Sequence, residues 1–183
     1  MKKFPIFLVL VILSLVILAS GCVTNDEGVE TKTYSDNGIS FNYNGTWDIA
    51  ESTAPNKVVA VGDPRTVDAQ NNPSTFVLIQ KPNETEDKDL WTVYSENYAK
   101  LFNNTTSGNI TNQRISEANI TINNEKALEN IYKTNSNGVE TQMRAVWISR
   151  NGEIYVILCG AAPNNFEKEQ NNFDLVINSF KVL

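Results

Sequence analysis

Histidine is absent from this 183-residue chain, which removes several kinds of chemistry at once. Without an imidazole there is no general base for a serine or cysteine nucleophile of the triad type. A histidine-ligated zinc site and an imidazole pH switch are excluded for the same reason. Catalysis would therefore have to come from carboxylates or from cysteine.

Carboxylates are the main remaining candidates for acid–base chemistry. Six lie on or near segments that we expect to be strands: Glu51, Asp63, Asp68, Glu129, Glu140 and Glu153. Two carboxylates flanking a sugar can hydrolyse a glycosidic bond, but no nucleophile–base motif accompanies these six. Acids are common here, with 21 Asp and Glu against 15 Lys and Arg. We therefore expect no catalytic residue, and keep an envelope hydrolase as the alternative.

A second acidic group, consisting of Glu84, Glu86, Asp87 and Asp89, precedes an expected helix. Calcium takes about six to eight oxygen ligands, and this short run lacks the spacing of an EF-hand loop. Acids also stabilise a helix N-terminus, and Asp87 and Asp89 are suitable caps. We expect a helix start, with no metal site and no cofactor. A small-molecule or metal receptor is a further alternative.

The single thiol outside the N-terminal segment is Cys159, which ends the apolar run over 154–159. Reactive thiols need an electropositive, partly exposed setting. A thiol within an apolar strand instead behaves as a small buried hydrophobe. Cys159 is therefore expected to be a core residue.

Aromatic residues mostly fall on apolar faces of the expected elements, where core packing explains them. Trp91 differs, because it lies one helical position off the stripe formed by Leu90, Tyr94 and Tyr98. An exposed tryptophan is typical of interfaces with other proteins. Trp91 is our interface candidate.

The N-terminus has the order of an export signal. Lys2 and Lys3 precede an apolar run over 4–19, and small residues then lead to Cys22. This order is typical of a secretory signal. Its Gly-Cys end is similar to the lipobox of secreted lipoproteins, in which the cysteine carries the lipid, although Ala19 stands where that motif prefers a larger aliphatic residue. We expect cleavage after residue 21 and lipidation of Cys22.

Either form of anchor places the domain on the outer face of the cytoplasmic membrane. The alternatives to lipidation are free secretion and an uncleaved anchor helix, for which the apolar run is short of the roughly 20 residues required. Without Lys2 and Lys3 the chain has 13 basic and 21 acidic residues, a net charge of −8. Such acidity argues against a nucleic-acid partner. Residues 22–33 are polar and aperiodic, and we expect a flexible tether there.

Asparagine is unusually frequent, and six asparagines lie in Asn-x-Ser/Thr sequons. They are Asn44, Asn83, Asn103, Asn104, Asn109 and Asn119. In an exported protein these are candidate glycosylation sites. An Asn- and Thr-rich chain also produces sequons by chance, so the motif alone leaves their use open.

The hydrophobic pattern predicts two helices and at least seven strands. Apolar residues recur at helical spacing over 89–102 and 164–179. Alternating or β-branched runs predict strands over 38–43, 57–61, 75–80, 115–122, 126–133, 139–150 and 153–161. Asn-Gly or Asn-Asn pairs separate the last four, which predicts consecutive antiparallel hairpins. The run over 154–159 predicts a central strand buried on both faces. Strands and helices in this order indicate an α+β domain.

Three segments together resemble the PsbP-like family. They are YSDNGISFNY at 34–43, NITINNEKA at 119–127, and an ending made of IYVI at 154–157, Phe166, Phe173 and INSFK at 177–181. Asn44 stands where the family usually has proline, and Asn124 where its hairpin usually has glycine. The resemblance implies an αβα sandwich around an antiparallel sheet of about six strands, a fold shared with the Ran-binding Mog proteins.

The resemblance also suggests the PsbP-related lipoproteins of methanogenic archaea. The best-known family members are extrinsic photosystem II subunits that help to retain calcium and chloride, a role that nothing in this sequence supports. We carry over the fold and a non-enzymatic binding or assembly role, with no individual functional residue. The expected organisation is a signal over 1–21, a tether over 22–33 and a PsbP-like domain over 34–183, held at the membrane beside an envelope protein partner.

Overall fold

The computed structural model describes residues 30–68, 72–83, 88–103 and 110–183. The expected signal over 1–21, the lipidation site Cys22 and most of the expected tether lie outside these residues, as do Glu84, Glu86, Asp87, Asn104 and Asn109. Within the described part of the chain, no helix is long and apolar enough to cross a membrane.

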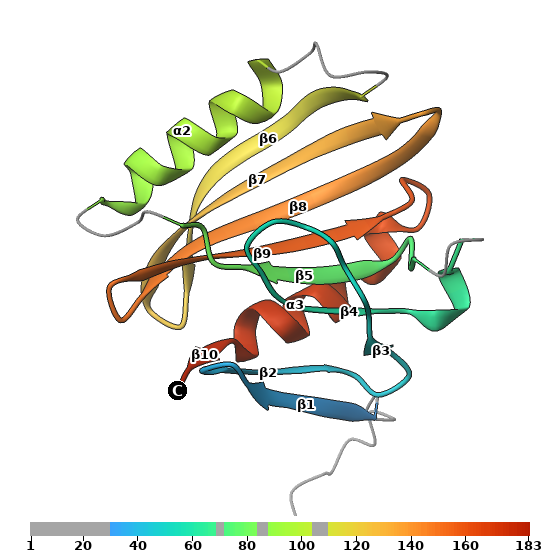
Figure 1. Cartoon of the computed structure of the whole chain (residues 1–183), viewed down its shortest axis with the longest axis horizontal. Coiled ribbons are helices and arrows are strands. Elements are labelled where there is room, and N and C mark those ends of the chain that lie inside the picture. The colour runs from blue at the N-terminus through green and yellow to red at the C-terminus, as the bar shows by residue number, and fades with distance from the viewer. Residues whose placement is uncertain (1–29, 69–71, 84–87, 104–109) are drawn as a thin grey trace, which may run out of the picture.

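A seven-stranded antiparallel sheet forms the centre of the domain (Figure 1). In spatial order its strands are β3 (Asp48–Ile49), β4 (Lys57–Gly62), β5 (Phe76–Gln80), β9 (Glu153–Ala161), β8 (Val139–Arg150), β7 (Glu125–Ser136) and β6 (Ile110–Ile122). β9 is the middle strand and is buried along most of its length. The apolar run over 154–159 predicted this position, because a strand covered on both faces has no polar face.

A second, three-stranded sheet consists of β1 (Thr31–Asp36), β2 (Ile39–Asn44) and β10 (Lys181–Val182). The expected tether is therefore wrong for residues 31–33, which pair with β2 in register. β1 buries a single side chain, Tyr34, which stacks on Phe41 with ring centroids 5.2 Å apart. An edge strand with one buried residue has too little apolar pattern to be distinguished from a polar linker.

Two helices cover opposite faces of the large sheet. α2 (Leu90–Asn103) matches the helix expected over 89–102. α3 (Gln170–Ser179) occupies only part of the range expected over 164–179, because a 3₁₀ turn, η3 (Phe166–Glu169), precedes it. Another 3₁₀ turn, η2 (Pro64–Thr66), follows β4. Apolar spacing alone does not separate a 3₁₀ turn from the first turn of an α-helix.

The hairpin turns have the backbone that their sequences predicted. Asn137-Gly138 and Asn151-Gly152 have positive φ at both positions, with values of 52° and 86° and of 53° and 80°. Asn123 and Asn124 have φ values of 52° and 67° in the β6–β7 turn. Two successive residues of positive φ match the right-handed twist of the flanking strands. These turns fix the registers of β6 to β9.

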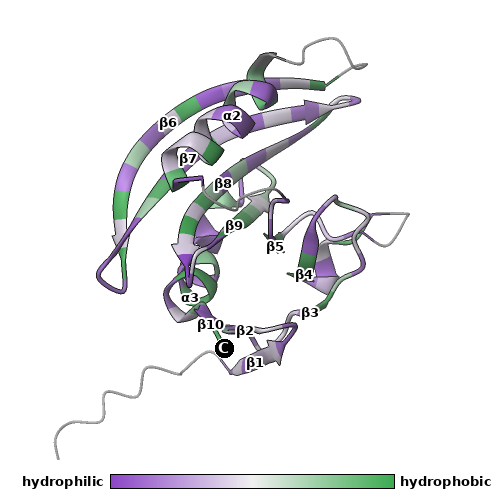
Figure 2. Cartoon of the chain, turned by 60° about the vertical axis from the view of Figure 1, so that its left-hand side comes forward, coloured by the Kyte–Doolittle hydropathy of each residue, from purple (hydrophilic) through white to green (hydrophobic). Residues whose placement is uncertain are grey.

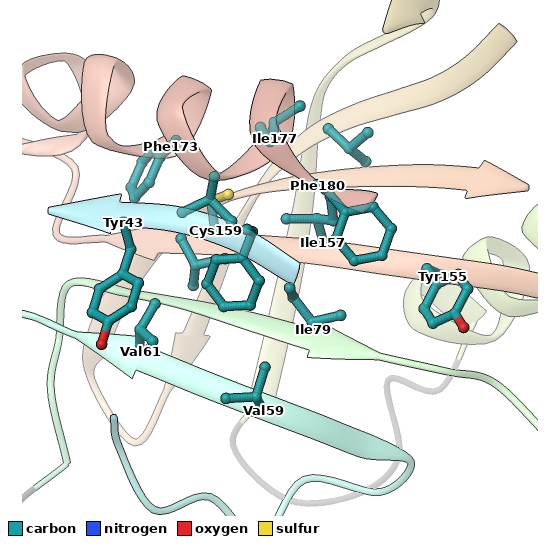
Figure 3. Close-up of a cluster of buried hydrophobic side chains, with 14 of the residues drawn as sticks. Tyr43, Val59, Val61, Ile79, Tyr155, Ile157, Cys159, Phe173, Ile177 and Phe180 are labelled. Atoms are coloured by element: carbon teal, nitrogen blue, oxygen red, sulfur yellow. The ribbon is translucent and has the colours of Figure 1, made fainter. Parts of the chain in front are cut away.

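Strand side chains alternate between two hydrophobic clusters, one on each face of the large sheet. Figure 2 shows the corresponding alternation of hydrophobic and hydrophilic residues along β6 and β8. On β8, Val146 and Ile148 belong to the cluster beneath α3 and the small sheet, whereas Ala145 and Trp147 belong to the cluster beneath α2. Figure 3 shows Cys159 in the α3 cluster, near Phe173 and Ile177. The α+β sandwich is thereby confirmed, with seven strands in its main sheet and a small second sheet beside α3.

Candidate binding site on the α2 side of the sheet

A row of aromatic rings runs along α2 from solvent into the core. Trp91 is 54% exposed, and its ring centroid lies 5.6 Å from that of Tyr94. Tyr94 stacks on Tyr98 at 5.0 Å, and Tyr98 meets Phe102 edge-on at 4.7 Å. Phe102 then contacts the buried ring of Tyr132 on β7 at 5.9 Å. The spacing of four residues places Tyr94, Tyr98 and Phe102 on one face of the helix, and Trp91 lies at the edge of that face.

β6 fixes the C-terminal half of α2 through two polar side chains. The Arg114 guanidinium lies over the rings of Tyr98 and Phe102, 4.7 and 4.6 Å from their centroids. The Asn112 amide nitrogen donates to the Leu101 carbonyl at 2.8 Å. A cation over an aromatic face contributes about 0.5–1 kcal/mol at an exposed site. Neither contact could be predicted from the sequence, because the residues of a polar edge strand do not indicate which helix residues they contact.

Between α2 and the sheet lies a cavity of about 230 Å³. Its walls come from β5, α2, β7, β8 and β9, and none of its lining residues is charged. They are Gln80, Asn97, Tyr98, Leu101, Asn130, Tyr132, Ala145, Trp147, Val156 and Leu158. We call this space the α2 cavity.

Asn130 is the most deeply buried polar residue of the α2 cavity, with 1% of its surface exposed. Its amide oxygen accepts from the Trp147 indole nitrogen at 3.1 Å. An indole N–H can only donate, so this contact fixes which amide atom is the oxygen. The amide nitrogen has no hydrogen-bond partner among the described residues.

Two further amide side chains line the α2 cavity, and each uses only its nitrogen in a hydrogen bond. Asn97 donates to the Val93 carbonyl, and Gln80 donates to the Pro55 carbonyl, both at 2.8 Å. Each bond uses the nitrogen and leaves the amide oxygen without a partner within the described segments. The cavity therefore combines aromatic and aliphatic walls with a few neutral polar groups, which is the usual composition of a small-molecule site.

A second cavity of about 380 Å³ lies beside the first on the same face of the sheet. It is mainly apolar, with a floor that includes Ala60, Phe76 and Leu78, and a rim from the chain around Ser52. Leu158 lines both cavities. The second cavity thus extends the α2 cavity along the part of the sheet face that α2 does not cover.

Burial raises the pKa values of the tyrosines near α2. It raises the pKa of Tyr132 to about 12, with a smaller contribution from Tyr98. The pKa of Tyr94 is also raised, chiefly by burial and then by the Glu117 carboxylate. A tyrosine is neutral at pH 7 even at its ordinary pKa near 10, so these shifts matter only in alkaline solution.

The strand acids proposed for hydrolysis have structural partners instead. Glu129 accepts from Arg144 at 2.6 Å, Glu140 pairs with Lys133 at 3.0 Å, and Glu153 with Lys81 at 3.1 Å. Glu51 lies 3.9 Å from Lys57, and Asp68 accepts from the Asn72 backbone at 2.9 Å.

Asp63 is the buried acid of this group. It accepts two hydrogen bonds from the Arg65 side chain, at 2.8 and 2.7 Å, and caps η2 through the Arg65 backbone. The Arg65 side chain lowers the pKa of Asp63, against the effect of burial. Across the described residues, no three Asp, Glu or Cys side chains are grouped to hold a metal ion.

Two of the sequence predictions are confirmed at the residue level. Asp89 caps α2, accepting from the Thr92 backbone at 3.0 Å and from its hydroxyl at 2.7 Å. Cys159 is fully buried, and burial raises the pKa of its thiol.

The sequons that can be placed differ in accessibility. Asn83 and Asn119 are exposed. Asn44 is half-buried, and its amide nitrogen, the atom that a glycan would occupy, donates to Asn172 at 2.9 Å. Asn103 ends α2. Glycosylation at these positions stays a prediction.

Comparison with known families gives a direct match. The chain matches the family described as PsbP-like protein over residues 19–182. It belongs to the PsbP-like family. No curated protein matches it.

Solved structures share this PsbP-like fold at low sequence identity. The cyanobacterial PsbP (CyanoP) from Synechocystis is 17% identical with a TM-score of 0.62, covering 85% of this chain and 94% of that one. LpqN of Mycobacterium tuberculosis, described as involved in cell envelope biogenesis, is 15% identical with a TM-score of 0.55, covering 84% and 90%. A point mutant of the protein Mog1 is 10% identical with a TM-score of 0.48, covering 84% and 96%. The fold assignment rests on the first two.

Proposed function

We propose that this PsbP-like chain is an exported, membrane-anchored protein whose domain binds an envelope protein without catalysing a reaction. The observation that supports it best is Trp91, a large apolar side chain left 54% exposed at the solvent end of a buried aromatic row. Tryptophan with one face supported by the protein and the other free is a frequent energetic centre of interfaces.

The anchor is proposed from the N-terminal sequence. The apolar run over 4–19 is followed by Gly21-Cys22, which fits export and then lipidation of Cys22. One acyl chain holds a protein only marginally, so stable anchoring needs at least two. LpqN is described as involved in cell envelope biogenesis, and a comparable setting, in an archaeal envelope, is what we propose here.

The chemistry of the described residues supports a non-catalytic role. Five of the six strand acids lie within 4 Å of a Lys or Arg, Asp68 accepts from the Asn72 backbone, and the chain has no histidine. A carboxylate hydrolase needs one acid held protonated beside another that stays ionised. Asp63, the buried one, instead has its pKa lowered by Arg65.

Site-specific photo-crosslinking tests the partner surface in native membranes. A benzophenone amino acid at position 91 is expected to give a discrete crosslinked product with one envelope protein. Ile49 is the matched control, because it is 62% exposed and lies on β3, at the sheet edge opposite β6. Equal product patterns from positions 91 and 49, or no product from either, would contradict the proposed surface.

A further inference from the structure

The α2 cavity is a pocket partly open to solvent, with room for more than an ordered water. A single water needs only about 10–15 Å³, against about 230 Å³ here. Tyr98 and Leu101 line it on the α2 side, and the small residue Ala145 lies on the sheet side.

Asn130 gives this space a chemical preference. Its side chain is almost entirely buried, yet its amide nitrogen has no acceptor among the described residues. Trp147 fixes the amide orientation, so the free group is a donor. The nitrogen is not a fully buried unpaired atom, so its acceptor comes from the space of the cavity, either a water or an oxygen of a bound molecule.

The other lining residues limit which kind of molecule can carry that acceptor. Tyr98, Tyr132 and Trp147 present aromatic surface, and Leu101, Val156 and Leu158 present aliphatic surface. No lining residue carries a charge, so nothing would compensate an ionised ligand for the loss of its hydration.

We propose that the α2 cavity binds an uncharged small organic molecule with a flat apolar body and one oxygen acceptor. The body lies between the aromatic walls, and the oxygen accepts from the Asn130 amide nitrogen. The neighbouring cavity that shares Leu158 accommodates any apolar extension of the molecule. This site is separate from the partner surface at Trp91, and either can fail while the other stands.

Two isosteric probes isolate the hydrogen bond. Acetophenone carries a carbonyl oxygen, whereas α-methylstyrene has a CH₂ group in the same place. Each is titrated into the purified full chain in detergent, labelled with ¹⁵N at tryptophan. The indole N–H signal of Trp147 reports on the cavity, and the signal of exposed Trp91 serves as an internal reference. We expect both probes to shift the Trp147 signal, with acetophenone binding roughly threefold to tenfold more tightly.

Three variants distinguish the site from non-specific uptake. Asn130→Leu should abolish the preference for acetophenone, and Ala145→Leu should weaken both probes by filling the space while keeping the amide. Asn119→Leu, an exposed change on β6, should leave both affinities unchanged. Comparing the ratio of the two affinities between variants cancels any partition of the probes into detergent.

Two results would overturn the proposal. Trp147 signals that stay fixed at millimolar concentrations of both probes would mean that the cavity holds only water. A preference for acetophenone that survives in Asn130→Leu would mean that Asn130 does not recognise the oxygen. If Asn130→Leu fails to fold, Ala145→Leu alone decides, since unchanged binding in that variant contradicts the site.

Discussion

Arg144 connects the sheet to α3 through side chains from two elements. Its guanidinium donates to Glu129 on β7 at 2.6 Å, and to Asp174 and Gln170 on α3 at 2.7 and 2.9 Å. Burial opposes the charge on Arg144, but its bonds to Asp174 and Glu129 outweigh burial and raise its pKa. The side chains of Arg144 and Glu129 are 15% and 17% exposed, so the charge of each offsets the hydration that the other has lost.

Replacing Arg144 by leucine should therefore destabilise the domain by about 2–4 kcal/mol, because Glu129 would be left without a cation. The double variant Arg144→Leu/Glu129→Leu should recover most of that loss, since two apolar residues need no compensation. Urea unfolding of the four proteins in this cycle measures both effects. Independent, additive losses would show that the two charges are not coupled.

Tyr132 gives the α2 side a specific alkaline sensitivity. Its pKa is raised to about 12 in the folded state, whereas an unfolded tyrosine titrates near 10. A raised pKa supplies stability that is complete below about pH 10 and is lost as the pH rises toward 12. Over that pH window the free energy of unfolding of the native chain should fall by about 2–3 kcal/mol more than that of Tyr132→Phe. Parallel pH profiles of the two proteins would contradict this assignment.

At the element scale, the hairpin turns carry most of the register information. The Asn-Gly pairs predicted the turns at Asn137 and Asn151, and both have positive φ at their two central residues. Local chemistry decides such turns, so the sequence was sufficient for them. The strand β1 and the 3₁₀ turn before α3 were not predicted, because pairing with β2 and packing of Phe166 depend on distant segments.

The β6–β7 turn is the one where this chain departs from the family habit of glycine. Asn124 has a φ of 67°, a region that glycine adopts without a Cβ penalty. Asn124→Gly should therefore stabilise the domain by about 0.5 kcal/mol, and Asn124→Val should destabilise it by about 1–2 kcal/mol. Thermal unfolding of both variants measures this, with Gln113→Val, an exposed β6 position outside the turn, as the control. A destabilised Asn124→Gly or a stabilised Asn124→Val would mean that the turn does not limit stability.

The candidate site was only partly predictable from sequence. The exposure of Trp91 followed from its position off the helix stripe, and the structure confirms it. Asn130 and Arg114 were missed because their roles depend on partners from other elements, Trp147 on β8 and the rings of α2. Sequence periodicity assigns a residue to a face, but it does not identify the neighbour on the next strand.

At the scale of the whole molecule, the proposed anchor controls where the binding domain works. Cys22→Ser should release the protein from membranes or leave an unprocessed precursor, because the lipid acceptor is removed. Fractionation with immunoblotting distinguishes these forms by size. Ser20→Ala is the control, since it keeps both a small residue and Cys22. Membrane retention of Cys22→Ser at mature size would contradict lipidation.

The central claim is that an anchored, non-catalytic domain binds an envelope protein through Trp91. The most direct measurement is the mass of the native complex after mild solubilisation of membranes, compared for the native chain, Trp91→Glu and Ile49→Glu. Both substitutions place a charge at an exposed apolar site, and circular dichroism checks that each variant is folded. We predict a complex larger than the free chain that is reduced at least tenfold in Trp91→Glu and unchanged in Ile49→Glu. A complex that survives in Trp91→Glu, or a native chain that migrates alone, would contradict the account.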